Sequence, residues 1–227
     1  TLLFWFAIFA VHATESGLLM ARVNAEMTVE SIQRDVDRID ELRQAARDQG
    51  VSVHSALCAA QLLALRGGFQ RPPRRMVLGL TSLVSLRERL QPPLSPRAPG
   101  PYVSFTGTFH PVGAGRDLWD LARDVHRRIR QQVQQGVPLV LLPHMARSFR
   151  KKRLHLRPDN RPITRYFQRL ERWLPPVSLV SNIGRVSLAA PQGPLSLTGL
   201  SFLFALSSSG RIGASACTWQ GQLHWNF

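Results

Sequence analysis

The sequence predicts an α/β fold, in fuller terms an α+β mixed sheet with flanking helices. Three observations lead to this expectation. In the first part of the chain, segments with helical spacing of apolar residues alternate with short segments typical of strands. From residue 177 onward, strand-like segments separated by glycine turns dominate. Hydrophobic residues are 44% of the 227 residues and charged residues only 19%, which supports a sizeable core and argues against disorder.

Residues 2–11, LLFWFAIFAV, are apolar throughout, and two interpretations stay open. A strand buried on both faces has this composition. A signal peptide has an apolar stretch of this length, and the residues that follow loosely resemble a small-residue cleavage site. The segment lacks a basic start and a Met, which slightly favours the strand. Because the first residue is Thr1, we expect a fragment or a processed product.

Two helices are predicted next. The first spans residues 26–49 and stops at Gly50, and the second spans residues 51–66 with Ser52 as its N-cap. The first helix is indicated by one stripe of apolar residues spaced three or four apart: Val29, Ile32, Val36, Ile39 and Leu42.

The middle of the chain alternates between strand and helix. Residues 76–86 and 102–112 predict strands, and the proline-rich residues 91–101 between them predict a loop. Asp117 is expected to cap an amphipathic helix that ends at Gly136.

The end of the chain is rich in short β segments. We expect them at residues 177–189, 194–207, 211–219 and 222–227, with glycines marking the turns.

The composition excludes several classes of site. Two cysteines cannot supply a disulfide framework or a cysteine zinc site, and no metal site is expected from the histidines. Each histidine after the first is expected to be a packing or surface residue, and Cys58 to be a buried, inert thiol. No apolar run reaches the ~18 residues of a membrane span.

The formal net charge is +15, from 29 Lys+Arg against 14 Asp+Glu, and it is concentrated in residues 147–172. Three interpretations are open for this stretch. A solvated surface is favoured. The second is a docking patch for an acidic partner, such as the phosphates of CoA, an acidic carrier protein or an anionic membrane. Nucleic-acid binding is the least favoured, although Tyr166, Phe167 and Trp173 interleave with the arginines as stacking platforms would.

Five stretches together carry a resemblance to a known family. They are DQGVSVHSALCAAQLLALR (48–66), TSLVSLRERLQPP (81–93), DLWDLARDVHRRI (117–129), VSLVSNIGRVSL (177–188) and CTWQGQLHWNF (217–227). In their order and spacing they resemble the CoA-dependent acyltransferase superfamily, with its chloramphenicol acetyltransferase-like fold. This superfamily includes condensation domains, alcohol acetyltransferases and polyketide-associated acyltransferases. The resemblance implies one such lobe, with the N-terminal lobe largely missing.

The family's signature, His-His-x-x-x-Asp-Gly, has a degenerate counterpart in VHATESG at residues 11–17. His12 matches the catalytic His and Gly17 the Gly, whereas Val11 and Ser16 replace the first His and the Asp. The resemblance therefore divides the chain into residues 1–25, the strand and active-site segment, and residues 26–227, the condensation/acyltransferase-like lobe.

The resemblance implies acyl transfer from a CoA or phosphopantetheine thioester to a hydroxyl or an amine. His12 would act as general base, with Ser16 and Gly17 supporting its loop and no permanently bound cofactor. The family's Asp pairs with an Arg, for which Arg87 is a weak candidate here. Because Ser16 cannot form that ion pair, a weakened or inactive enzyme is a live alternative.

Further residues are expected near the thioester tunnel. Asn182 and Gly184 resemble the segment that lines it, and Ser181 and Thr218 are weaker candidates for its wall. The alternative is a structural Asn at a strand turn, with the glycine allowing positive φ.

The implied partners are acyl-CoA or an acyl carrier protein, and a small alcohol, lipid or amine acceptor. The expected location is cytoplasmic, with peripheral membrane contact through residues 147–172 and secretion left open. Two rivals remain: an inactive homologue acting as a binding module, and a basic secreted or nucleic-acid-binding protein.

Overall fold

The computed structural model describes residues 31–34, 36–95, 98, 100, 102–140, 147, 175–187, 197, 199–203 and 210–227. The expected strand at residues 2–11, the segment with His12, Ser16 and Gly17, and all of residues 147–172 except Arg147 lie outside this part of the chain.

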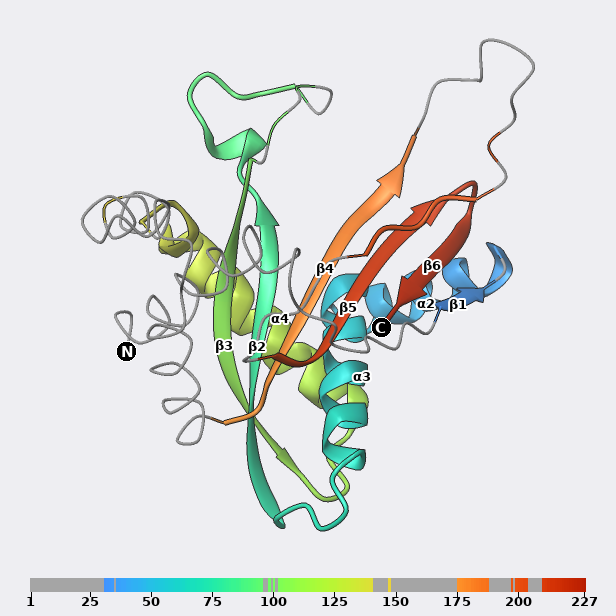
Figure 1. The fold of residues 1–227 in the computed structure, drawn as a ribbon, viewed down its shortest axis with the longest axis vertical. Coiled ribbons are helices and arrows are strands. Elements are labelled where there is room, and N and C mark those ends of the chain that lie inside the picture. The colour runs from blue at the N-terminus through green and yellow to red at the C-terminus, as the bar shows by residue number, and fades with distance from the viewer. Residues whose placement is uncertain are drawn as a thin grey trace, which may run out of the picture.

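The described residues form a mixed sheet with helices, as the sequence predicts. The elements are β1 (Ser31–Arg34), α2 (Val36–Asp48), α3 (Val53–Gly67), β2 (Arg75–Ser85), the 3-10 turn η2 (Arg87–Arg89), β3 (Val103–Gly113), α4 (Leu118–Gln134), β4 (Val177–Val186), β5 (Gly210–Trp219) and β6 (Gln222–Asn226). The strands lie in the order β1-β6-β5-β4-β2-β3 (Figure 1). The β2–β4 and β4–β5 pairs are parallel and the other pairs are antiparallel.

Helices α3 and α4 cover one face of the sheet (Figure 1). The face is set by the alternation of side chains along each strand. Leu78 and Leu80 of β2 point toward the helices and are fully buried. They pack with a core contributed by both helices and the neighbouring strands: Leu62, Leu121, Val125, Val112 and Val180. Helix α2 packs farther along, where Ile39 contacts the cluster of Leu57, Ala216 and Leu223.

The predicted helix ends are confirmed at their caps. The Ser52 hydroxyl accepts a hydrogen bond from the Ser55 N–H at 3.1 Å, and the Asp117 carboxylate accepts from Trp119 and Asp120 at 2.8 and 2.9 Å. These bonds satisfy N–H groups that the first turn of a helix leaves free. Gly50 has φ +66°, as expected for a glycine that ends a helix.

The helix predicted at residues 26–49 is wrong at residues 31–34. Residues Ser31–Arg34 form strand β1, paired with β6 in the register Ile32↔Trp225, and the helix begins at Val36. These residues form a strand because of a contact with the far end of the chain. Strand β6 pairs with β5 along one edge, and β1 pairs with the other edge and satisfies the backbone groups there.

The β segment expected at residues 194–207 is also wrong for the residues that the structure describes there. Residues 199–203 lie in no strand. Their carbonyls accept hydrogen bonds from side chains of the sheet instead: Ser215 Oγ donates to Phe202 at 2.5 Å, and Cys217 Sγ to Leu200 at 3.4 Å. The segment therefore packs, without regular secondary structure, on the face of the sheet that is opposite α3.

Candidate functional site: a fork in the sheet

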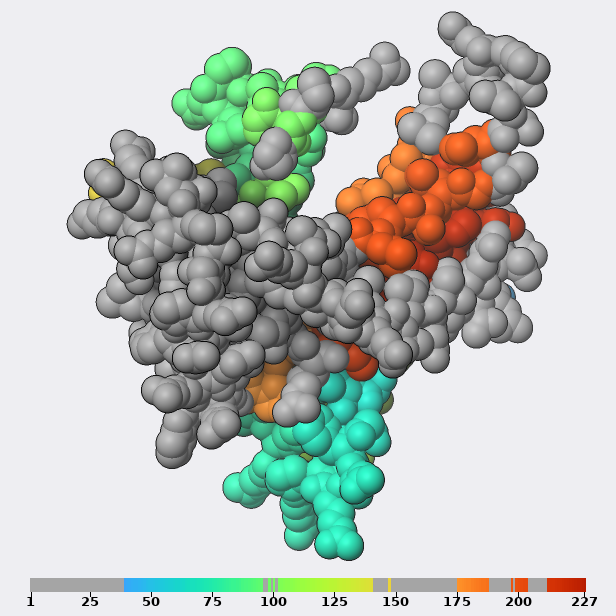
Figure 2. Space-filling model, in the orientation of Figure 1, coloured from blue at the N-terminus to red at the C-terminus, as the bar shows by residue number. Residues whose placement is uncertain are grey.

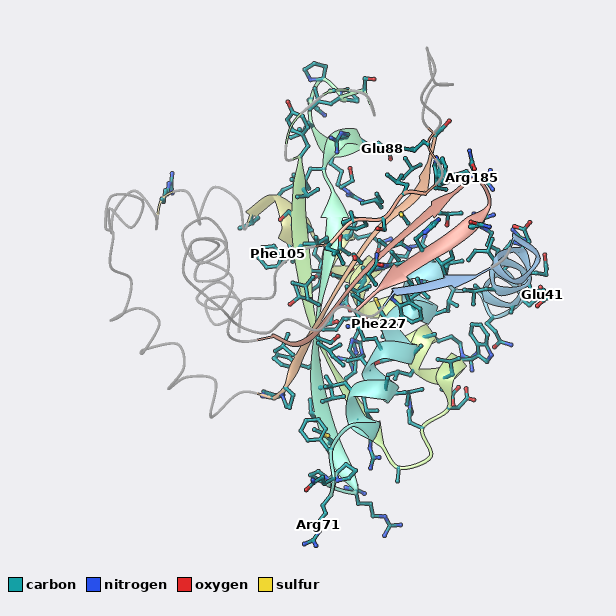
Figure 3. All side chains as sticks on the ribbon, turned by 45° about the vertical axis from the view of Figure 1, so that its right-hand side comes forward. Glu41, Arg71, Glu88, Phe105, Arg185 and Phe227 are labelled. Carbon is teal, nitrogen blue, oxygen red and sulfur yellow. The ribbon has the colours of Figure 1, made fainter. Side chains whose placement is uncertain are left out.

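The sheet splits between its two central strands. Strands β2 and β4 pair only from Gly79↔Val177 to Ser82↔Val180. Beyond that point β2 continues with β3 to Ser85, while β4 continues with β5 to Val186. The strand ends diverge (Figure 1), and the space-filling view is hollowed between the segment after β2 and the end of β4 (Figure 2). Glu88 and Arg185 stand on the two sides of this fork (Figure 3).

Asn182 and Gly184 lie on the β4 side of the fork, at a bulge. Asn182 is opposite Ala216 and Gly184 is opposite Cys217, so Ile183 has no residue across from it and is 54% exposed. Gly184 has φ +74°, and its N–H donates to Asn182 Oδ1 at 2.8 Å. The glycine therefore has the positive φ that the structural alternative expects, but at a bulge inside a strand and not at a turn. Within the described part of the chain the Asn182 Nδ2 amide has no hydrogen-bond partner.

Ser181 and Thr218, the weaker candidates for the tunnel wall, do not lie on the same face of the sheet. Ser181 lies opposite Ser215, on the sheet face crossed by residues 199–203. Thr218 is three residues farther along β5, opposite Leu223, which packs toward α2 and α3. Because side chains alternate along a strand, the two lie on opposite faces. Both are also buried, at 5% and 7% exposure.

A group that sequence analysis missed lies under the base of the fork. His54 Nε2 of α3 is 2.5 Å from Ser82 Oγ, at the last paired residue of β2, and 3.5 Å from Cys58 Sγ. The spacing of His54 and Cys58, four residues apart on one helix, is the signal that could have found it. Ser82 and Cys58 are 1% and 0% exposed, so no external substrate reaches them. The group therefore fixes α3 beneath the fork.

Burial sets the charge of this group. It lowers the pKa of His54 to about 4 and raises the pKa of the Cys58 thiol. At neutral pH both side chains are uncharged, and Cys58 is the inert thiol that the sequence predicts.

Acid is expected to destabilise the chain as pH falls from about 6.5 toward 4. The unfolded chain binds a proton on His54 near pH 6.5, whereas the folded chain resists it until about pH 4. The stabilisation is fully present above pH 6.5 and is lost at about 1.4 kcal/mol per pH unit within that window. Guanidinium unfolding of the parent and of His54→Gln across this range measures it, and the variant should show the shallower pH slope. A slope equal to that of the parent would contradict the assignment to His54.

A second buried group of hydrogen-bonded polar side chains connects β3 to α4. His110 Nδ1 is 2.8 Å from the Asp124 carboxylate, and its Nε2 is 2.7 Å from Thr108 Oγ1. Desolvation lowers the pKa of His110 in spite of the opposing Asp124. Burial alone would raise the pKa of Asp124, but hydrogen bonds from His110 and Arg128 lower it. The neutral imidazole therefore donates to an ionised Asp124 and accepts from Thr108, which orders the hydroxyl, imidazole and carboxylate as in a catalytic triad. Thr108 is only 4% exposed and His110 is fully buried, so no substrate reaches these side chains. The role of the Thr108–His110–Asp124 group is therefore structural.

Arg87, the weak candidate for the partner of the motif's Asp, forms no ion pair with any described residue. Its Nη2 donates to the carbonyls of Ala98 and Gly100, both at 3.2 Å. The guanidinium also lies 5.2 Å from the ring centroid of Tyr102. Its buried Nε has no hydrogen-bond partner among the described residues, so the two carbonyls satisfy only part of the guanidinium.

No group of three metal-binding side chains occurs in the part of the chain that the structure describes. Over the same residues, no helix combines the length and the apolar character needed to cross a bilayer.

The fold is that of condensation domains and CoA-dependent acyltransferases, as the sequence resemblance predicts. The structure of polyketide synthase associated protein 5 from Mycobacterium tuberculosis matches 88% of this chain with a TM-score of 0.57 at 17% identity. Trichothecene 15-O-acetyltransferase from Fusarium sporotrichioides matches 88% with a TM-score of 0.56 at 14% identity. The epimerization domain from the third module of tyrocidine synthetase B matches 97% with a TM-score of 0.54 at 16% identity. The chain spans about half the length of these structures, 46%, 42% and 51% respectively.

Residues 24–223 match the family model of the phthiocerol/phthiodiolone dimycocerosyl transferase C-terminus. The chain belongs to this family. A comparison with curated protein sequences finds no match.

Proposed function

We propose that the chain takes part in acyl transfer from a CoA or phosphopantetheine thioester to a hydroxyl, or alternatively to an amine. The observation that carries the proposal is the family match over residues 24–223. The fork adds support, because its diverging strands leave an open space beside β4, the strand that carries Asn182. The Fusarium relative is named as an O-acetyltransferase, and a hydroxyl acceptor agrees with that name.

In this proposal the acceptor enters with its proton, and His12 removes it as the oxygen or nitrogen attacks the thioester carbonyl. A neutral imidazole has the right pKa for this step near pH 7. The thiolate of CoA or phosphopantetheine leaves, and no covalent bond to the protein forms. Ser16 and Gly17 would hold the loop of His12, and the Asn182 amide would donate a hydrogen bond to the thioester carbonyl.

The proposed donors, acyl-CoA or an acyl carrier protein, place the reaction in the cytoplasm. The acceptor would be a small alcohol, a lipid or an amine.

The test is release of free thiol. Acetyl-CoA, longer acyl-CoA and an acyl-phosphopantetheine would each be offered with a panel of alcohols and amines. We expect thiol release that depends on both the chain and an acceptor, with the acylated product found by mass spectrometry. No release above the chain-free background with any pair would overturn the proposal.

An inactive homologue that binds thioesters is the second candidate, favoured by Val11 and Ser16 in place of the motif's His and Asp. It predicts saturable binding of a non-cleavable acyl-CoA analogue, measured by calorimetry, without thiol release. Binding and release together would exclude it.

A further inference from the structure

Several arginines lie close together at the end of the molecule where a loop connects α3 to β2. This arginine tip is formed by Arg66, Arg71, Arg74 and Arg75. Arg66 lies in the last turn of α3, Arg75 is the first residue of β2, and Arg71 points outward at the extreme lower end of the molecule (Figure 3).

The loop that carries the tip is held in one shape. Arg66 Nε donates to the carbonyl of Val112 at 3.0 Å, and its Nη2 to that of Pro73 at 3.2 Å. Phe69 packs against the core below α3. Arg66 and Phe69 thus anchor the loop from within, whereas Arg71, Arg74 and Arg75 are exposed.

The positive charge of the tip is not neutralised within the described part of the chain. There, the side chains of Arg71, Arg74 and Arg75 have no hydrogen bond and no ion pair. No Asp or Glu occurs in the sequence between Asp48 and Glu88. The nearest acid after β3, Asp117, already caps α4. Like charges held together in this way repel one another, and an external anion relieves the repulsion.

The shape of the tip decides which anion fits. In the space-filling view the loop projects as the narrow lower end of the molecule (Figure 2). A small phosphate ligand is bound in a concave site that surrounds it, whereas a projecting end suits a broad, flat surface. Val77, two residues into β2 from Arg75, adds a 47% exposed apolar side chain next to the arginines. Basic residues with neighbouring apolar side chains are typical of contact with anionic lipid.

We propose that the arginine tip docks the protein peripherally on an anionic lipid membrane. The lipid phosphates and carboxylates would lie against Arg71, Arg74 and Arg75, with Val77 at the edge of the contact. This surface differs from the stretch 147–172 to which the sequence assigned membrane contact. The proposal does not depend on acyl transfer.

The test is co-sedimentation of the chain with vesicles of phosphatidylcholine, with and without phosphatidylserine. We expect binding to the vesicles that contain phosphatidylserine, and its loss as salt is raised. The triple variant Arg71→Gln/Arg74→Gln/Arg75→Gln should lose about a hundredfold in affinity, since each arginine near such a surface contributes about 1 kcal/mol. Circular dichroism would establish that the variant is folded.

The matched control removes the same charge elsewhere. Arg47→Gln/Arg89→Gln/Arg130→Gln alters three exposed arginines away from the tip and should bind close to the parent. Equal loss in the two triple variants would overturn the proposal, because net charge alone would then explain binding. So would equal binding to neutral vesicles, or tighter binding of the tip to an acidic protein or a single-stranded nucleic acid at the same salt.

Discussion

Replacing His12 by alanine is expected to lower the rate of acyl transfer by about 10²–10⁴-fold, the usual contribution of a general base. The acceptor then keeps its proton while it attacks, which makes it a weak nucleophile. Thioester binding should change little, because the proposed carbonyl contact comes from Asn182 and the acyl group would lie in the fork. Initial rates of thiol release, measured over a range of acyl-CoA, separate kcat from KM.

The matched control is His126→Gln, since His126 lies on α4 and contacts Ser55 at 3.3 Å on the side of the sheet away from residues 199–203. It should transfer acyl groups at the parental rate. A His12→Ala chain as active as the parent would remove the general-base role while leaving the acyltransferase assignment intact.

What the sequence predicts well is local. The caps at Ser52 and Asp117 and the glycine at residue 50 are recognisable because a helix end needs a particular side chain or a particular φ within a few residues. The strands β2 to β6 are recognisable from apolar runs between turns. The positive φ of Gly184 and its bond to Asn182 Oδ1 are local features of the kind that the structural alternative expects, although they lie at a bulge inside β4 and not at a turn.

What the sequence does not predict depends on pairing between distant residues. The apolar stripe that includes Ile32 has helical spacing, yet Ile32 lies in a strand, because the edge of β6 comes from the far end of the chain. The fork could not be predicted either, because no feature of the β2 or β4 sequence indicates that their pairing ends at Ser82 and Val180. The pair of His54 and Ser82 joins residues 28 positions apart. Such contacts arise only from the way in which the strands are ordered.

Removing the carboxylate of Asp124 is expected to destabilise the fold strongly, by about 2–4 kcal/mol for Asp124→Ala. The Asp124 side chain is 9% exposed and accepts from His110, Arg127 and Arg128. Alanine leaves the His110 Nδ1–H donor buried without an acceptor, and it frees the Thr108–His110 pair from α4. Denaturant unfolding at neutral pH measures the change.

Two further variants make this outcome interpretable. Asp124→Asn keeps an oxygen that can accept from His110 but loses the charge, so it should cost only about 1–2 kcal/mol and still fold if the alanine variant does not. Asp120→Ala removes an exposed carboxylate one turn earlier, 2.5 Å from Arg123, and should cost less than about 1 kcal/mol because water screens that pair. If Asp124→Ala is no more destabilising than Asp120→Ala, then His110 is satisfied without the carboxylate. In that case packing, and not the buried hydrogen bond, holds α4 on β3.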